Sequence, residues 1–158
     1  MDAMTTAVLF VCLGNICRSP LAEAAFRAET ARLGLDVEVD SAGTGDWHVG
    51  HPPDPRARAT AARHDIDISH LRARQVTHGD FARFDHIVAL DARNLADLLA
   101  MRPRDSRARL CLLLDHAEGR EGEAVADPYH GGEAEFDAVW ADVREGARGL
   151  AEAIGRGR

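Results

Sequence analysis

Short apolar runs alternate with longer stretches of helical periodicity along this chain. Three continuous apolar runs predict strands at Ala7–Val11, Ile87–Leu90 and Leu110–Leu114, and the second is typical of a central parallel strand covered on both faces. A further strand, exposed on one side, is predicted at Leu35–Val39, where apolar and acidic residues alternate. The apolar pattern therefore predicts about four short strands.

Helices are predicted between the strands by apolar periodicity and by the residues at their ends. Ser19 and Pro20 fit the N-cap and first position of a helix that stops at Gly34. Asp91 is expected to cap a helix that ends before Pro103. The last helix carries an apolar stripe at helical spacing, made of Phe136, Val139, Trp140, Val143, Ala147, Leu150, Ala151 and Ile154.

The order of these elements predicts an α/β fold. A long loop is expected at Ser41–Pro55, with Asp54 and Pro55 starting the next helix. Strands alternating with helices indicate one domain over residues 1–158: an open, doubly wound parallel sheet of about four strands, with helices on both faces. Ligands of such sheets bind at the carboxyl ends of the strands, which is where the first strand reaches Cys12.

Composition and charge narrow the class of protein. Apolar content of 46% and charged content of 28% are ordinary for a globular domain, and the net charge of −7 argues against a nucleic-acid binder. No apolar stretch is long enough to span a bilayer or to form a signal peptide, so no membrane partner is expected. An odd number of cysteines, three, argues against a disulfide framework and favours the cytoplasm. We expect a monomer or a weak dimer.

The richest chemistry follows the first strand, at Cys12–Pro20. A turn that leads from a strand into a helix aims backbone N–H groups at one point, with the positive end of the helix dipole behind them. The segment therefore predicts a phosphate-binding loop. The helix dipole and Arg18 favour the thiolate form of Cys12. A nucleophile beneath a site for a tetrahedral oxyanion suits attack on phosphorus.

Individual side chains of this turn fit such a site. The planar fork of Arg18 can hold two phosphate oxygens, a geometry that lysine cannot reproduce. Ser19 either donates a hydrogen bond to the Cys12 thiolate or only caps the helix, and the two roles are compatible. Gly14 and Asn15 are residue types that tolerate the left-handed backbone that a loop with inward N–H groups would need.

These residues resemble the low-molecular-weight protein tyrosine phosphatases, in their bacterial form. The specific part is Val11–Pro20, with Cys12 and Arg18 in a Cys-x5-Arg motif, together with the distant Asp127-Pro128-Tyr129. The likeness extends to five further segments: Ser41–Thr44, Asp46–Gly50, Pro53–Arg56, Ala73–Gln75 and Phe84–Asp85.

The resemblance implies hydrolysis of phosphotyrosine through a phosphocysteine intermediate. Cys12 would be the nucleophile, Arg18 the phosphate clamp and Asp127 the general acid and base. Substrate-binding residues would be Leu13, Gly14, Asn15, Ile16, Cys17, Ser19, Trp47 and Tyr129, the two aromatic residues flanking the substrate ring. Partners would be tyrosine-phosphorylated proteins or peptides, with inorganic phosphate or other oxyanions as product or inhibitor. No cofactor and no metal are expected.

Two features concern regulation. By the same resemblance, Cys12 and Cys17 could form a reversible disulfide that shields the nucleophile from over-oxidation. Many family members carry two adjacent tyrosines after Asp-Pro, whereas here His130 follows Tyr129. Regulation through phosphorylation of a second tyrosine is therefore in doubt, and an imidazole is placed near the mouth of the site.

Three alternatives remain on the same scaffold. Arsenate reductases of this type need cysteines in the middle of the chain, and none lies between Cys17 and Cys111. Protein-arginine phosphatases tend to carry threonine at Ile16, whose apolar side chain suits a phenyl ring instead. An idle phosphate-binding or thiol-redox sensor would keep the phosphate-binding loop, but nothing needed for turnover is missing from the sequence.

Overall fold

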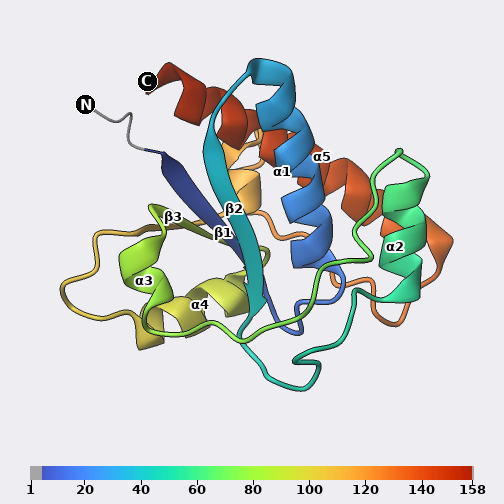
Figure 1. The fold of residues 1–158 in the computed structure, drawn as a ribbon, viewed down its shortest axis with the longest axis horizontal. Helices are drawn as coiled ribbons and strands as arrows, with labels where there is room; N and C mark the ends of the chain where they lie inside the picture. Colours follow the sequence, from blue (N-terminus) through green and yellow to red (C-terminus); the bar gives the residue numbers. More distant parts are fainter. Residues whose placement is uncertain (1–4, 158) are drawn as a thin grey trace.

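A parallel sheet forms the centre of the molecule in the computed structural model, which describes residues 5–157. Its strand order is β2-β1-β3-β4, and all neighbouring strands are parallel (Figure 1). The strands are β1 (Thr6–Cys12), β2 (Val37–Gly43), β3 (His86–Ala89) and β4 (Arg109–Leu112). The first strand of the chain is therefore central, with β2 on one side and β3 on the other.

Helices cover both faces of this sheet (Figure 1). They are α1 (Arg18–Leu33), α2 (Pro55–Ala62), α3 (Asp80–Arg83), α4 (Ala92–Met101), the 3-10 helix η1 (Leu113–His116) and α5 (Glu133–Arg156). The α/β, doubly wound prediction is confirmed. Within residues 5–157, no helix is both long and apolar enough to cross a membrane.

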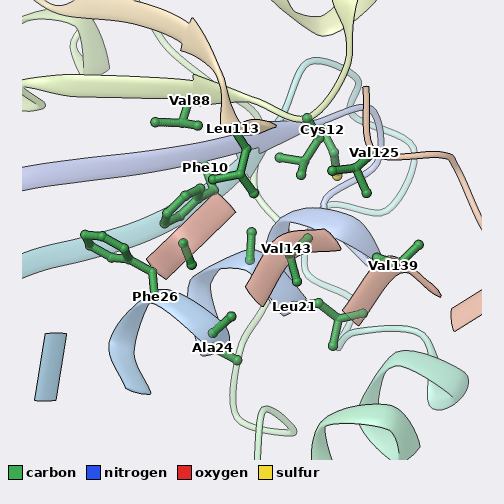
Figure 2. Close-up of a cluster of buried hydrophobic side chains, with 14 of the residues drawn as sticks. Phe10, Cys12, Leu21, Ala24, Phe26, Val88, Leu113, Val125, Val139 and Val143 are labelled. Atoms are coloured by element: carbon green, nitrogen blue, oxygen red, sulfur yellow. The ribbon is translucent and has the colours of Figure 1, made fainter. Parts of the chain in front are cut away.

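Side chains of β1 point alternately into two cores. Leu9 packs in a cluster with α3 and α4, whereas Phe10 and Cys12 pack in a second cluster with α1 and α5. Phe10 meets Phe26 of α1 edge to face, with ring centroids 5.4 Å apart. Figure 2 shows this second cluster, in which Cys12 and Val125 lie at one end. The nucleophile candidate is thus attached directly to the core.

The end signals of three helices are confirmed. Gly34 ends α1 with a left-handed φ of 68°, as a glycine there permits. Asp54 caps α2 and Asp91 caps α4, each by accepting a backbone hydrogen bond from the first turn of its helix.

The prediction that Ser19 caps α1 was wrong. The helix begins at Arg18, and its N-cap, Cys17, makes no side-chain capping bond. Ser19 lies inside the first turn, and its hydroxyl contacts the Cys12 sulfur at 3.0 Å. Of the two roles considered for Ser19, the structure supports the contact with Cys12.

Two strand boundaries also differ from the prediction. Ser41–Gly43 extends β2 instead of starting the loop, because these residues pair with Phe10–Cys12. The strand predicted to run through Leu114 ends at Leu112, where the chain turns into η1 and the Asp115 carboxylate accepts the Leu112 N–H at 3.0 Å. Leu35 lies before β2 because its N–H closes the end of α1 on the Thr30 carbonyl.

Candidate active site

The loop of residues 12–18, called the Cys12 loop here, joins β1 to α1 and is anchored through its carbonyl oxygens. Three of these accept backbone hydrogen bonds from the segment after β2: Cys12 from Thr44 at 2.9 Å, Leu13 from Gly45 at 2.9 Å and Ile16 from Asp54 at 2.8 Å. Among residues 5–157, no protein acceptor bonds the N–H groups of Leu13, Gly14, Ile16, Cys17 and Arg18. A row of unpaired N–H groups beside a helix start is suited to bind an oxyanion.

Gly43 allows this loop to lie against the end of β2. A Cβ atom on Gly43 would be 2.7 Å from the Leu13 carbonyl oxygen and 3.2 Å from the Asn15 nitrogen. Any larger residue would therefore push the Cys12 loop away from the sheet.

Cys12 lies at the base of the loop and is only 3% exposed. Its sulfur accepts a hydrogen bond from the Asn15 N–H at 3.3 Å. Asn15 adopts a left-handed φ of 58°, as predicted, which brings that N–H over the sulfur. Gly14, the other residue type named as tolerating such a backbone, does not have a positive φ. One left-handed residue is therefore enough to turn the loop.

The side chain of Asn15 sets the direction of the hydrogen bond between Ser19 and Cys12. Its Oδ1 accepts the Arg74 N–H at 3.0 Å, which turns Nδ2 toward two serine hydroxyls. Nδ2 donates to Ser19 at 2.7 Å and to Ser41 at 3.0 Å. Because Ser19 Oγ accepts from Asn15, its own hydrogen is free to point at the Cys12 sulfur.

The same group of hydrogen bonds ends at a buried carboxyl. Ser41 donates to Glu23 Oε1 at 2.9 Å, and Arg27 donates to Glu23 Oε2 through two nitrogens at 3.0 and 2.9 Å. Burial raises the pKa of Glu23, and Arg27 partly offsets that rise. A chain of side-chain hydrogen bonds thus runs from Ser19, which contacts the sulfur, through Asn15 and Ser41 to Glu23 and Arg27.

Arg18 is the buried cation of the site. Its Nη1 donates to the Asp91 carboxylate at 2.7 Å and to the Val125 carbonyl at 2.9 Å. No hydrogen bond within residues 5–157 uses its Nε or Nη2, and Nη2 lies 3.9 Å from Asp127 Oδ2. One edge of the guanidinium is therefore fixed, and the other is available for two oxygens of a phosphate.

Asp127 belongs to a loop of residues 127–132, called the Asp127 loop here. Its side chain is 49% exposed, and its Oδ1 accepts the Tyr129 N–H at 3.1 Å. The Asp127 loop and the Cys12 loop line one cavity of about 280 Å³. The cavity is lined by Cys12, Leu13, Gly14, Ile16, Cys17, Arg18, Trp47, His48, Asp127, Tyr129 and His130.

The structure brings together nearly all of the residues that the sequence singled out. Asn15 and Ser19 are the exceptions, because they lie behind Cys12 and not on the cavity wall. Cys17 lines the cavity as a free thiol, and burial together with Asp54 raises its pKa well above the usual range. No three His, Cys, Asp or Glu side chains in the described part of the chain are arranged to hold a metal ion.

Several residues of the site were not predicted from the sequence. His48 lines the cavity, and Asp91 pairs with Arg18 in addition to capping α4. Asp91 lies two residues after the end of β3, the neighbour of β1, so its place at the carboxyl edge of the sheet could have indicated it. Glu23 and Ser41 gave no such signal, since their meeting with Asn15 depends on tertiary packing.

Comparisons with known proteins agree with this geometry. The sequence model of the family described as "Low molecular weight phosphotyrosine protein phosphatase" matches residues 7–158. The protein of that name from Schizosaccharomyces pombe is 46% identical over 132 residues, which are 82% of this chain and 84% of that protein. The crystal structure of YfkJ from Bacillus subtilis superposes with a TM-score of 0.92 at 38% identity, covering 100% of this chain and 99% of YfkJ. A Drosophila arginine phosphatase superposes with a TM-score of 0.87 at 32% identity, covering 93% and 96% of the two chains.

Proposed function

The chain belongs to the low molecular weight phosphotyrosine protein phosphatase family, and we propose that it cleaves phosphotyrosine through a phosphocysteine on Cys12. Membership makes it a phosphoric monoester hydrolase. One observation carries the assignment of roles: the Cys12 sulfur, unpaired N–H groups, the free edge of Arg18 and the Asp127 carboxylate converge on one cavity. No cofactor is part of the proposal.

In the first step, the Cys12 thiolate attacks phosphorus in line with the phenolic oxygen. The N–H groups of the Cys12 loop and the free nitrogens of Arg18 bind the three non-bridging oxygens, whose charge they stabilise in the transition state. The Ser19 hydroxyl donates to the sulfur and favours its thiolate form. The P–O bond breaks as the S–P bond forms.

Asp127 handles the protons of both steps. As a carboxylic acid it protonates the departing phenolic oxygen, which leaves Asp127 as a carboxylate. That carboxylate then takes a proton from water, the water oxygen attacks phosphorus, and the S–P bond breaks to regenerate the Cys12 thiolate. Inorganic phosphate is the second product, so oxyanions of similar shape should compete for the same cavity.

Phosphotyrosine in proteins or peptides is the proposed substrate, and phosphoarginine is the alternative on this scaffold. Ile16 offers hydrocarbon and no hydroxyl to a substrate, while Trp47 and Tyr129 present two exposed aromatic rings on the wall of the cavity. The two rings can flank a flat substrate group, and Ile16, which lacks the hydroxyl that a guanidinium could use, favours a phenyl group there.

Matched peptides carrying either phosphotyrosine or phosphoarginine test the substrate assignment. We expect a higher kcat/KM for phosphotyrosine, and the variant Ile16→Thr should narrow the difference between the two peptides. Faster cleavage of phosphoarginine by the unchanged protein would contradict the assignment.

A thiol switch is proposed for the same site, on the strength of the family resemblance. A peroxide would oxidise the Cys12 thiolate to a sulfenic acid, and the Cys17 thiol would attack that sulfur, releasing water and forming a disulfide. Both thiols are free in the structure, and burial keeps Cys17 protonated, so it does not compete with Cys12 for phosphate. Such a switch suits a compartment that otherwise keeps thiols reduced, and we propose the cytoplasm.

A further inference from the structure

The segment Pro53–Arg56 contacts both loops that line the active-site cavity. The Asp54 N–H donates to the Ile16 carbonyl of the Cys12 loop at 2.8 Å. Two residues later, Arg56 Nη1 donates to the Gly131 carbonyl of the Asp127 loop at 2.9 Å. This short segment therefore connects the loop that carries the nucleophile with the loop that carries the acid.

The side chains of Asp54 and Arg56 form a rigid unit. Asp54 Oδ1 accepts from the Arg56 N–H at 2.8 Å and from Nε at 3.0 Å, while Oδ2 accepts from Nη2 at 2.9 Å. Asp54 is also the N-cap of α2, so the helix fixes its position. With one edge of the guanidinium held by Asp54, its Nη1 is directed at Gly131.

Two aromatic rings hold the same guanidinium. Its central carbon lies 5.7 Å from the ring centroid of Tyr129, in the Asp127 loop, and 4.8 Å from that of Phe136 in α5. Phe136 is fully buried, so its ring gives Arg56 a fixed support. Cation–π contacts of this kind fix the position of a planar guanidinium as well as its charge.

The Asp127 loop has few other connections to the body of the protein. Its hydrogen bonds from Gly131 to Pro128 and from Tyr129 to Asp127 are local. Among residues 5–157, Arg56 is the one side chain from outside the loop and α5 that donates a hydrogen bond to residues 127–132. Besides the longer contact of 3.9 Å between Arg18 Nη2 and Asp127 Oδ2, Arg56 is therefore the side chain that ties this loop to the segment beside the Cys12 loop.

We propose that Arg56 is a positioning residue that holds the Asp127 carboxylate at the correct place above Cys12. The inference rests on the proposed function, because it assumes that Asp127 is the acid. Arg56 itself does not line the cavity and acts through the Gly131 carbonyl and the Tyr129 ring. Its loss should affect proton transfer to the leaving group more than phosphate binding.

The test compares two substrates that differ in their need for an acid. Arg56→Met should lower kcat/KM for phenyl phosphate by about 10-fold to 100-fold, since a misplaced catalytic group loses most of its contribution. The loss for 2,4-dinitrophenyl phosphate, whose leaving group needs no proton, should stay below about 3-fold. Arg56→Lys keeps the charge without the fork and should show a smaller loss of the same kind.

Arg58→Met is the matched control, because Arg58 lies on the same helix and, among residues 5–157, its side chain donates to the Pro53 carbonyl and to neither loop of the cavity. We expect it to match the wild type on both substrates. Inhibition by inorganic phosphate should be unchanged in Arg56→Met, which would show that the Cys12 loop is intact.

A double variant decides whether Arg56 acts through Asp127. Adding Arg56→Met to Asp127→Ala should cause no further loss on phenyl phosphate, since the acid is already absent. A further loss of about 10-fold, or equal losses on both substrates in the single variant, would overturn the inference. If Asp127→Ala itself slowed both substrates equally, the proposed acid would be wrong, and that result is distinct from a failure of Arg56 alone.

Discussion

The Cys12 loop and the Asp127 loop face the same cavity, but they are held in different ways. In the Cys12 loop, Asn15 and Arg18 are almost fully buried, and hydrogen bonds of their side chains join the loop to four other segments. In the Asp127 loop, Asp127 and Tyr129 are about half exposed, and Arg56 provides the side-chain hydrogen bond from the body of the protein.

This difference separates two tasks of the site. Binding a phosphate requires many donors in fixed positions before the substrate arrives, and a loop built into the core supplies them. Delivering one proton requires a single carboxyl near water, and an exposed loop is sufficient for that. Changes in the first loop should therefore alter all substrates alike, whereas changes in the second should depend on the leaving group.

The largest effect is expected for Cys12→Ser. The hydroxyl is a far weaker nucleophile than the thiolate, so turnover should fall by about 10⁴-fold or more. Binding of inorganic phosphate should persist within about 3-fold, because the loop N–H groups and Arg18 supply the contacts. Phosphate release and calorimetric titration with phosphate measure the two quantities. Residual turnover of a few per cent would show that another residue is the nucleophile.

Asp127→Ala is expected to follow, with an effect that depends on the substrate. On phenyl phosphate, kcat/KM should fall by about 10²-fold or more, the usual contribution of a general acid. On 2,4-dinitrophenyl phosphate, the loss should be less than about 3-fold, since that leaving group departs unprotonated. A series of aryl phosphates of graded leaving-group acidity measures this dependence. An equal loss across the series would remove the contrast between the two loops.

Asn15→Ala tests whether a change in the Cys12 loop has an effect that does not depend on the leaving group. Alanine loses three side-chain hydrogen bonds and must adopt the left-handed φ of 58°, so the free energy of unfolding should fall by about 2–3 kcal/mol. We expect kcat/KM to fall by a similar factor on all aryl phosphates. Asn15→Gly permits the backbone without the side chain, so its difference from Asn15→Ala isolates the backbone term. A loss confined to poor leaving groups would contradict the interpretation.

The smallest effect is expected for Glu23→Gln, and it appears in the pH dependence of stability. Burial raises the pKa of Glu23 above its ordinary value of 4.5. Such a group contributes most to stability below pH 4.5, and that contribution is lost as the pH rises through the folded-state pKa. Glutamine has no charge to bury, so the melting temperature of the variant relative to the wild type should rise from acidic to neutral pH.

The control for this prediction is Glu29→Gln, on the same helix. Glu29 pairs with the half-exposed Arg32, and among the described residues its side chain has no other hydrogen-bond partner. The change should shift the melting temperature little and equally at both pH values. The same pH trend in both variants would exclude burial of Glu23 as the cause.

Local patterns in the sequence were enough to predict the fold. Strand periodicity and end residues such as Gly34, Asp54 and Asp91 act over a few neighbouring positions, so they could be interpreted without the tertiary structure. The errors in element boundaries arose where tertiary contacts determine the secondary structure. Ser41–Gly43 looked like the start of a loop, but pairing with β1 makes it strand.

The site could be predicted only in part, for the same physical reason. For residues that share a short motif, such as Cys12 and Arg18, the spacing in the sequence predicts their chemical roles. Glu23, Ser41 and Arg56 act through partners that lie 18 to 75 positions away. Their side chains are ordinary in isolation, and only the packing of α1, β2 and the Asp127 loop shows what they contact.

The bond from Arg18 to the Val125 carbonyl spans 107 positions of the chain, and this has a consequence for biosynthesis. A growing chain that has folded its first strand and helix holds the thiol but lacks both the acceptor for Arg18 and Asp127. Full phosphatase activity on phenyl phosphates therefore requires that the segment carrying Val125 and Asp127 has folded against the sheet. During refolding, activity should return together with, or after, the burial of Trp140 in α5. Recovery of activity would therefore mark a late step of folding.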